Sequence, residues 1–190
     1  MKTEKTFAKS LVLLALALLV LFGSRIYDPR PSEAAAVAAK PAMQLQHPWT
    51  AVASTAAIDE SSLFSYAFEK PHLTFASGVT TTSLIAHYNV TNTYDNSPSP
   101  SNPGWSTLEM GSSAPPGSTV TARLWEVDKC TAARTLICTA TNSGGGDPVC
   151  SYCSFGLGSV DFADNLYYVE VTLTRASATV FPRLHTLRIY

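Results

Sequence analysis

The feature that most constrains the fold of this chain is a strict alternation of apolar and polar residues in segment 166–174 (LYYVEVTLT). Successive side chains of a β-strand point to opposite faces, so a period of two predicts a strand with one buried face. A similar alternation runs through segment 83–94 (SLIAHYNVTNTY). The residues predicted to face the core are Tyr167, Val169, Val171 and Leu173 in the first segment, and Leu84, Ala86, Tyr88 and Val90 in the second.

Further short apolar runs, separated by clusters of Gly, Pro, Ser and Asn, fill the rest of residues 56–190. Segments 119–128 and 135–141 indicate a hairpin around residues 129–134, whereas 142–158 is typical of a loop. No window beyond the N-terminus shows the three-and-four spacing of an amphipathic helix. We therefore expect one all-β domain over 56–190, an antiparallel β-sandwich that is jelly-roll-like.

The first 25 residues indicate an export signal. Lys2, Lys5 and Lys9 precede the unbroken apolar run 11–22, which is the arrangement of a signal peptide. Twelve helical residues rise only about 18 Å, less than the ~30 Å hydrocarbon core of a bilayer. We expect residues 1–25 to be a signal peptide and the protein to be secreted or extracytoplasmic. The alternative is an uncleaved, short N-terminal membrane anchor formed by residues 11–22.

Residues 26–55 are rich in Pro and Ala and show almost no periodicity. Such a composition buries too little apolar surface to offset chain entropy. The sequence therefore predicts a linker between the export signal and the sandwich.

The charge pattern narrows the class of partner. The formal net charge is −1, only 14% of residues are charged, and no Lys/Arg run occurs outside the N-terminal region. Nucleic-acid binding needs clustered cations, so we expect no nucleic-acid partner. A surface of Thr, Ser and Asn suits a polar partner such as a glycan or a cell-envelope component. Self-association remains an alternative.

The cysteines Cys130, Cys138, Cys150 and Cys153 form an even set in a chain with an export signal, which predicts two disulfides. Cys130 and Cys138 flank the expected hairpin turn. This favours the pairs Cys130–Cys138 and Cys150–Cys153, and the competing scheme is Cys130–Cys153 with Cys138–Cys150. A zinc site is a further alternative, although only 150–153 has the usual C-x2-C spacing.

No sequence motif for a cofactor is present, and we expect none. Weak calcium candidates are Asp161 and Asp164, because hard cations prefer oxygen ligands. The competing interpretation is that Asp164 simply forms the turn into the strand at 166–174.

The expected function is a non-enzymatic binding or structural module, exposed at the surface or secreted. Candidate ligand-facing aromatic residues, able to stack on a sugar ring, are Tyr94, Trp105 and Tyr168. The alternative is a small secreted hydrolase acting on polysaccharide. Such an enzyme needs two facing carboxyls, and Glu126 and Glu170 are the strand carboxylates that the alternative would use.

Overall fold

The computed structural model describes residues 47–93 and 102–190. The predicted export signal (1–25), the linker up to residue 46 and Tyr94 lie outside the described residues. Within the described ranges, no helix is both long and apolar enough to cross a membrane. The described residues form two antiparallel sheets, which confirms the all-β antiparallel sandwich.

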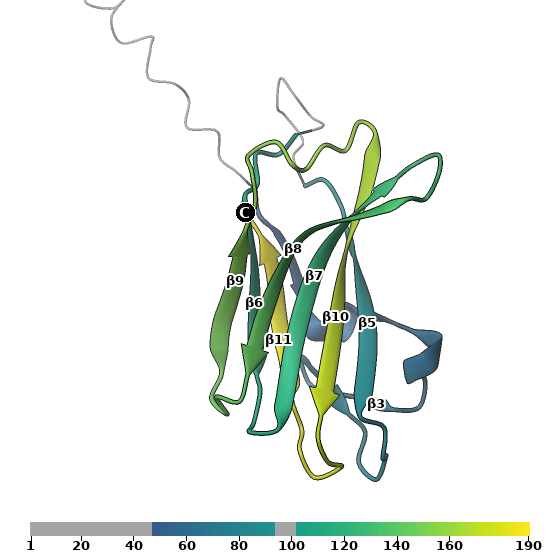
Figure 1. Ribbon diagram of the computed structural model, residues 1–190, viewed down its shortest axis with the longest axis vertical. Helices are drawn as coiled ribbons and strands as arrows, with labels where there is room; N and C mark the ends of the chain where they lie inside the picture. Colours follow the sequence, from purple (N-terminus) through teal and green to yellow (C-terminus); the bar gives the residue numbers. More distant parts are fainter. Residues whose placement is uncertain (1–46, 94–101) are drawn as a thin grey trace, which may run out of the picture. The chain divides into compact units, whose positions relative to one another are not determined.

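The five-stranded sheet, called sheet B, has the order β2-β5-β10-β7-β8. In Figure 1, strands β8, β7, β10 and β5 lie side by side in one layer. The long strands β7 and β10 pair along their whole length, from Ser118 opposite Arg175 to Asp128 opposite Asn165. The strands of sheet B are β2 (Ala57–Ile58), β5 (Ser83–Val90), β7 (Ser118–Asp128), β8 (Arg134–Ser143) and β10 (Asn165–Arg175).

The six-stranded sheet, called sheet A, has the order β3-β4-β11-β6-β9, and β1 also pairs with β11. Two short 3-10 turns, η2 (Ala53–Thr55) and η3 (Glu60–Ser62), follow β1 and β2. The strands of sheet A are β1 (Trp49–Val52), β3 (Tyr66–Glu69), β4 (His72–Phe75), β6 (Thr107–Ser113), β9 (Val149–Ser154) and β11 (Arg183–Ile189).

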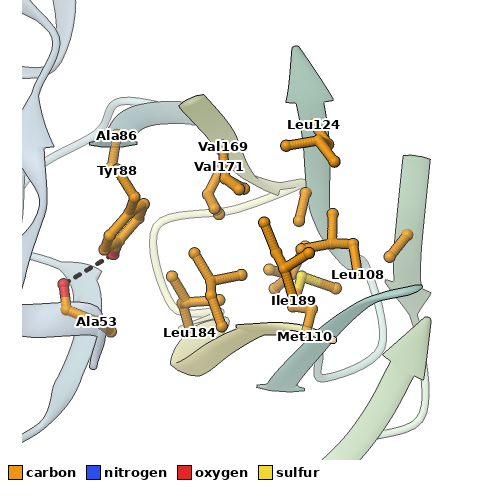
Figure 2. Packing of buried hydrophobic residues seen from close by; sticks show 14 of the residues in the cluster. Ala53, Ala86, Tyr88, Leu108, Met110, Leu124, Val169, Val171, Leu184 and Ile189 are labelled. Atoms are coloured by element: carbon orange, nitrogen blue, oxygen red, sulfur yellow. Dashed lines mark hydrogen bonds between the residues drawn. The ribbon is translucent and has the colours of Figure 1, made fainter. Parts of the chain in front are cut away.

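The inward faces of the two sheets share one hydrophobic core. Figure 2 shows Leu108, Met110, Leu184 and Ile189 of sheet A pointing toward Leu124, Val169 and Val171 of sheet B. The alternation in 166–174 and 83–94 predicts this packing correctly: all eight residues expected to face the core are at most 3% exposed.

The folded region begins earlier than the sequence predicts. Residues 49–52, assigned to the linker, form β1 against β11, and Trp49 is 5% exposed. The Tyr88 hydroxyl donates a hydrogen bond to the Ala53 carbonyl oxygen at 2.8 Å, which is the dashed line in Figure 2. A four-residue strand is too short to show periodicity, and its partner lies at the opposite end of the chain.

The expected loop 142–158 contains strand β9, which pairs with β6. Strand β6 also continues through Gly111 to Ser113. A Cβ at Gly111 would lie 2.6 Å from Thr186 Oγ1, so any larger residue there would force Thr186 to move. The glycine therefore reflects close packing within the sheet and not a turn.

The edge strands β8 and β9 are joined by a disulfide between Cys138 and Cys153. Neither predicted pairing scheme contains this bond, so both are wrong. All four cysteines lie in the described part of the chain, and within it Cys130 and Cys150 are exposed and free. The disulfide links the two sheets at one edge of the sandwich.

Candidate functional site

The outward face of sheet B carries a row of aromatic and polar side chains. Residues at alternate positions of β7 and β10 are buried in the core, so those between them face away from it. The strand register places Trp125 opposite both Tyr168 of β10 and Leu136 of β8, and Tyr168 opposite Asn89 of β5. The row therefore crosses four strands.

Trp125 and Tyr168, which we call the aromatic platform, are nearly parallel. Their ring centroids lie 6.5 Å apart with 15° between the planes, within the range of offset-stacked pairs. The Arg134 guanidinium carbon lies 5.6 Å from the centroid of the Trp125 ring, and Arg134 Nη1 donates to the Tyr168 hydroxyl at 3.2 Å. His87 packs edge-to-face on Tyr168 at 5.5 Å. These contacts orient both rings before any ligand arrives.

The next row of the same face is charged. Register pairs place Glu170 between Arg123 of β7 and His87 of β5. Arg123 Nη1 lies 3.2 Å from Glu170 Oε1, and His87 Nε2 lies 3.7 Å from Glu170 Oε2. The Glu170 side chain is only 18% exposed. Polar groups able to bind hydroxyls thus border the aromatic platform.

Trp125 differs from the other tryptophans. All three tryptophans lie among the described residues, and Trp49 and Trp105 belong to the buried core. Trp125 is half-buried, and its Nε1 atom is inaccessible to solvent yet has no hydrogen-bond partner within the described structure. An unpaired buried donor is costly, but an atom that solvent cannot reach is equally out of reach of a ligand, so the accessible group of Trp125 is its ring and not its N–H.

The structure places the three candidate aromatic residues differently. Tyr168 lies on the outward face of sheet B, as the alternation predicts. Trp105 is fully buried: its Nε1 donates to the His47 carbonyl oxygen at 3.1 Å, and its ring packs edge-to-face on Phe162. Trp105 is therefore a core residue and cannot face a ligand. Tyr94 lies outside the described residues.

Trp125 is not among the predicted ligand-facing residues, although the alternation in its own strand points to it. In segment 119–128, Val120, Ala122 and Leu124 form the inward face. The same period of two places Trp125 on the outward face. What the sequence could not give is the register that sets Trp125 beside Tyr168.

The strand carboxylates do not meet. Glu126 points toward the inner side of sheet B, where its Oε2 accepts a hydrogen bond from the buried Tyr167 at 3.2 Å. Glu170 lies on the outward face with Arg123. Asp128 caps the hairpin turn, and hydrogen bonds from Thr131 and then Cys130 lower the pKa of its carboxyl. Glu126 and Glu170 therefore cannot form the facing pair that a hydrolase needs.

The two calcium candidates serve local structure. Asp161 Oδ1 accepts from the Ala163 backbone N–H at 2.9 Å, and Asp164 Oδ1 lies 2.7 Å from Lys129 Nζ. Among residues 47–93 and 102–190 there is no group of three or more His, Cys, Asp or Glu side chains placed to hold a metal ion.

A histidine cluster lies on sheet A. His185 Nδ1 is 2.6 Å from His72 Nδ1, and His185 Nε2 is 2.8 Å from Ser113 Oγ. Burial, followed by the charges of His72 and Arg183, lowers the pKa of His185. A bond between two ring nitrogens needs one proton and one lone pair, so the cluster requires at least one neutral imidazole.

Sheet A also carries a shallow groove of about 480 Å³, lined in part by Thr50, Glu109, Thr186 and Arg188. Tyr152 on β9 is 71% exposed, and Arg188 lies over the Tyr190 ring at 4.7 Å. These side chains do not bring two parallel aromatic rings together. They provide matched controls for the aromatic platform.

No family model matches the sequence, and no curated protein does. The chain is distantly similar in structure to several solved carbohydrate-binding modules. A CBM36 module in complex with calcium and xylotriose has a TM-score of 0.45 at 10% identity, covering 75% of this chain and 99% of its own. The CBM36-1 domain of a xylanase from the hindgut metagenome of Trinervitermes trinervoides gives 0.47 at 9%, covering 76% and 97%.

A family 6 module from Clostridium cellulolyticum in complex with xylose gives a TM-score of 0.42 at 16% identity, covering 75% of this chain and 96% of its own. All three TM-scores are below 0.5 and all identities are below 25%. These likenesses are distant and carry no conclusion about the function of this chain.

Proposed function

We propose that the protein is a non-catalytic glycan-binding module of jelly-roll type, which binds a polysaccharide on the outward face of sheet B. The observation that carries the proposal is the nearly parallel pair of Trp125 and Tyr168 on adjacent strands. Apolar C–H faces of sugar rings pack on aromatic rings, while the hydroxyls around them need hydrogen-bond partners. The neighbouring Arg123 and Asn89 supply such partners.

The separation of Glu126 from Glu170 supports binding over hydrolysis, because the two carboxylates lie on opposite sides of sheet B. We further propose that the protein acts outside the cytoplasm. The basic and apolar N-terminal segment supports this, and so does a disulfide, which persists in oxidising compartments.

The test is binding to polysaccharides that differ in backbone, such as cellulose, xylan, galactan and chitin, by co-sedimentation and then by calorimetry on oligosaccharides. Trp125→Ala and Tyr168→Ala are expected to weaken binding at least about tenfold, because aromatic side chains dominate binding energy at such surfaces. Tyr152→Ala removes a ring from sheet A that is 71% exposed, and so more accessible than either platform ring, and is the control.

Melting temperatures of all variants establish that they are folded. Binding that survives in both Trp125→Ala and Tyr168→Ala, or that is lost in Tyr152→Ala, contradicts the proposed face. A wild-type protein that binds none of the polysaccharides contradicts the proposed function itself.

A further inference from the structure

We infer that the glycan bound at the aromatic platform carries carboxylates, that is, that it contains uronic acid residues recognised by Arg134. This inference rests on the proposed function and names its ligand class. It comes from the hydrogen-bond donors, acceptors and charges around Trp125 and Tyr168.

The platform has more donors than acceptors. Arg134 is exposed and offers five N–H groups, and its one hydrogen bond among the described residues goes to the Tyr168 hydroxyl. A ligand that completes this set must bring acceptor oxygens.

The nearby carboxylate already has partners. Glu170 lies in the row beside the platform, and its two oxygens face Arg123 at 3.2 Å and His87 at 3.7 Å. Among the ion pairs of the described residues, none includes Arg134. Among the described residues, Glu170 acts on Arg134 only through a longer-range charge interaction, and no carboxylate forms an ion pair with the Arg134 guanidinium.

The position of Arg134 ties this charge to the sugar. Its guanidinium carbon lies 5.6 Å from the centroid of the Trp125 ring, so a pyranose next to this ring places its substituents within reach of Arg134. A planar guanidinium pairs with a carboxylate through two parallel hydrogen bonds. The C6 carboxylate of a uronic acid presents this geometry, whereas the hydroxymethyl group of a neutral hexose does not.

The experiment compares three acidic polysaccharides, glucuronoxylan, polygalacturonate and alginate, with their carboxyl-reduced derivatives. Oligosaccharides of each pair are titrated into the wild-type protein by calorimetry. We expect one acidic oligosaccharide to bind about tenfold more tightly than its reduced form, corresponding to one charge-assisted pair. A sulfated neutral oligosaccharide distinguishes carboxylate recognition from general attraction to anions.

Arg134→Gln removes the contacts that orient the two rings as well as the charge, so both forms can lose affinity, but the acidic oligosaccharide is expected to lose about tenfold more than the reduced form. Arg134→Lys keeps the charge but loses the planar fork, so it restores only part of the preference. Arg188→Gln is the control, because Arg188 also lies over an aromatic ring but on sheet A.

Binding of acidic and reduced forms with equal affinity, lost in Trp125→Ala, overturns this inference and leaves the proposed function standing. Equal affinity for the sulfated and carboxylated ligands overturns the assignment to uronic acid. Absence of any binding that depends on Trp125 overturns the proposed function and this inference together.

Discussion

Loss of the disulfide between Cys138 and Cys153 is expected to lower the free energy of unfolding by about 3 kcal/mol. The bond joins cysteines 15 residues apart. Closing a loop of this length removes about 10 cal/mol/K of entropy from the unfolded chain, or about 3 kcal/mol near 25 °C. That is a large part of the ~5–15 kcal/mol that stabilises a typical domain.

The assay is urea unfolding of the wild type, Cys138→Ser/Cys153→Ser and Cys130→Ser/Cys150→Ser. The last variant makes the same chemical change at the two exposed free cysteines and is expected to stay within about 0.5 kcal/mol of the wild type. Reducing the wild type with dithiothreitol removes the bond without changing side-chain volume. A loss below about 1 kcal/mol on reduction refutes the loop-closure argument. An equal loss in the control variant refutes the assigned pairing.

Three further predictions concern single positions. Leu173→Ala should cost about 2–5 kcal/mol in urea unfolding, because Leu173 is fully buried; Leu166→Ala, at a 60% exposed position of the same strand, should cost little. Gly111→Ala should lower the free energy of unfolding by about 1–3 kcal/mol through overpacking. Adding Thr186→Ala to this variant should relieve much of that loss, since Thr186 Oγ1 is the obstructing atom. A double variant whose loss equals the sum of the two single losses contradicts this contact. Acid should destabilise the wild type more than His185→Asn as the pH falls below 6.5, the ordinary His pKa. The reason is that the unfolded chain then binds a proton at His185, whereas the folded chain, in which the pKa of His185 is lowered, resists it. Thermal melts at about pH 8 and pH 5 measure the difference, and parallel pH profiles of the two proteins contradict it.

The sequence was informative where one strand has one buried face. The period of two in β5 and β10 identified inward residues such as Ala86 and Val171, both of which are fully buried. Hydrophobic burial acts on each residue of such a strand separately, so alternation along the chain is enough to show it.

The sequence was uninformative where structure depends on distant partners. Strand β9 (Val149–Ser154) lies at an edge of sheet A and has exposed side chains at most positions, so it lacks clear alternation. Its pairing with β6 decides that Cys153 lies near Cys138. No local spacing of cysteines encodes this arrangement, because the bond connects two different sheets.

The candidate site shows the same division. Alternation alone places Tyr168 outward, and the same reasoning applies to Trp125. The register of β7 against β10 makes the two rings neighbours, and the return of β8 brings Arg134 onto them. The site is therefore a product of strand pairing, which the sequence does not display.

The most direct test of the central claim is a two-dimensional proton–nitrogen NMR titration that follows the indole N–H signals of the three tryptophans. Trp125→Phe assigns the signal of Trp125. On adding an oligosaccharide that binds, the account predicts a large shift of the Trp125 signal, because the sugar packs against the Trp125 ring. The buried Trp49 and Trp105 signals should stay nearly fixed. Saturable binding with an unchanged Trp125 signal would contradict the proposed binding face.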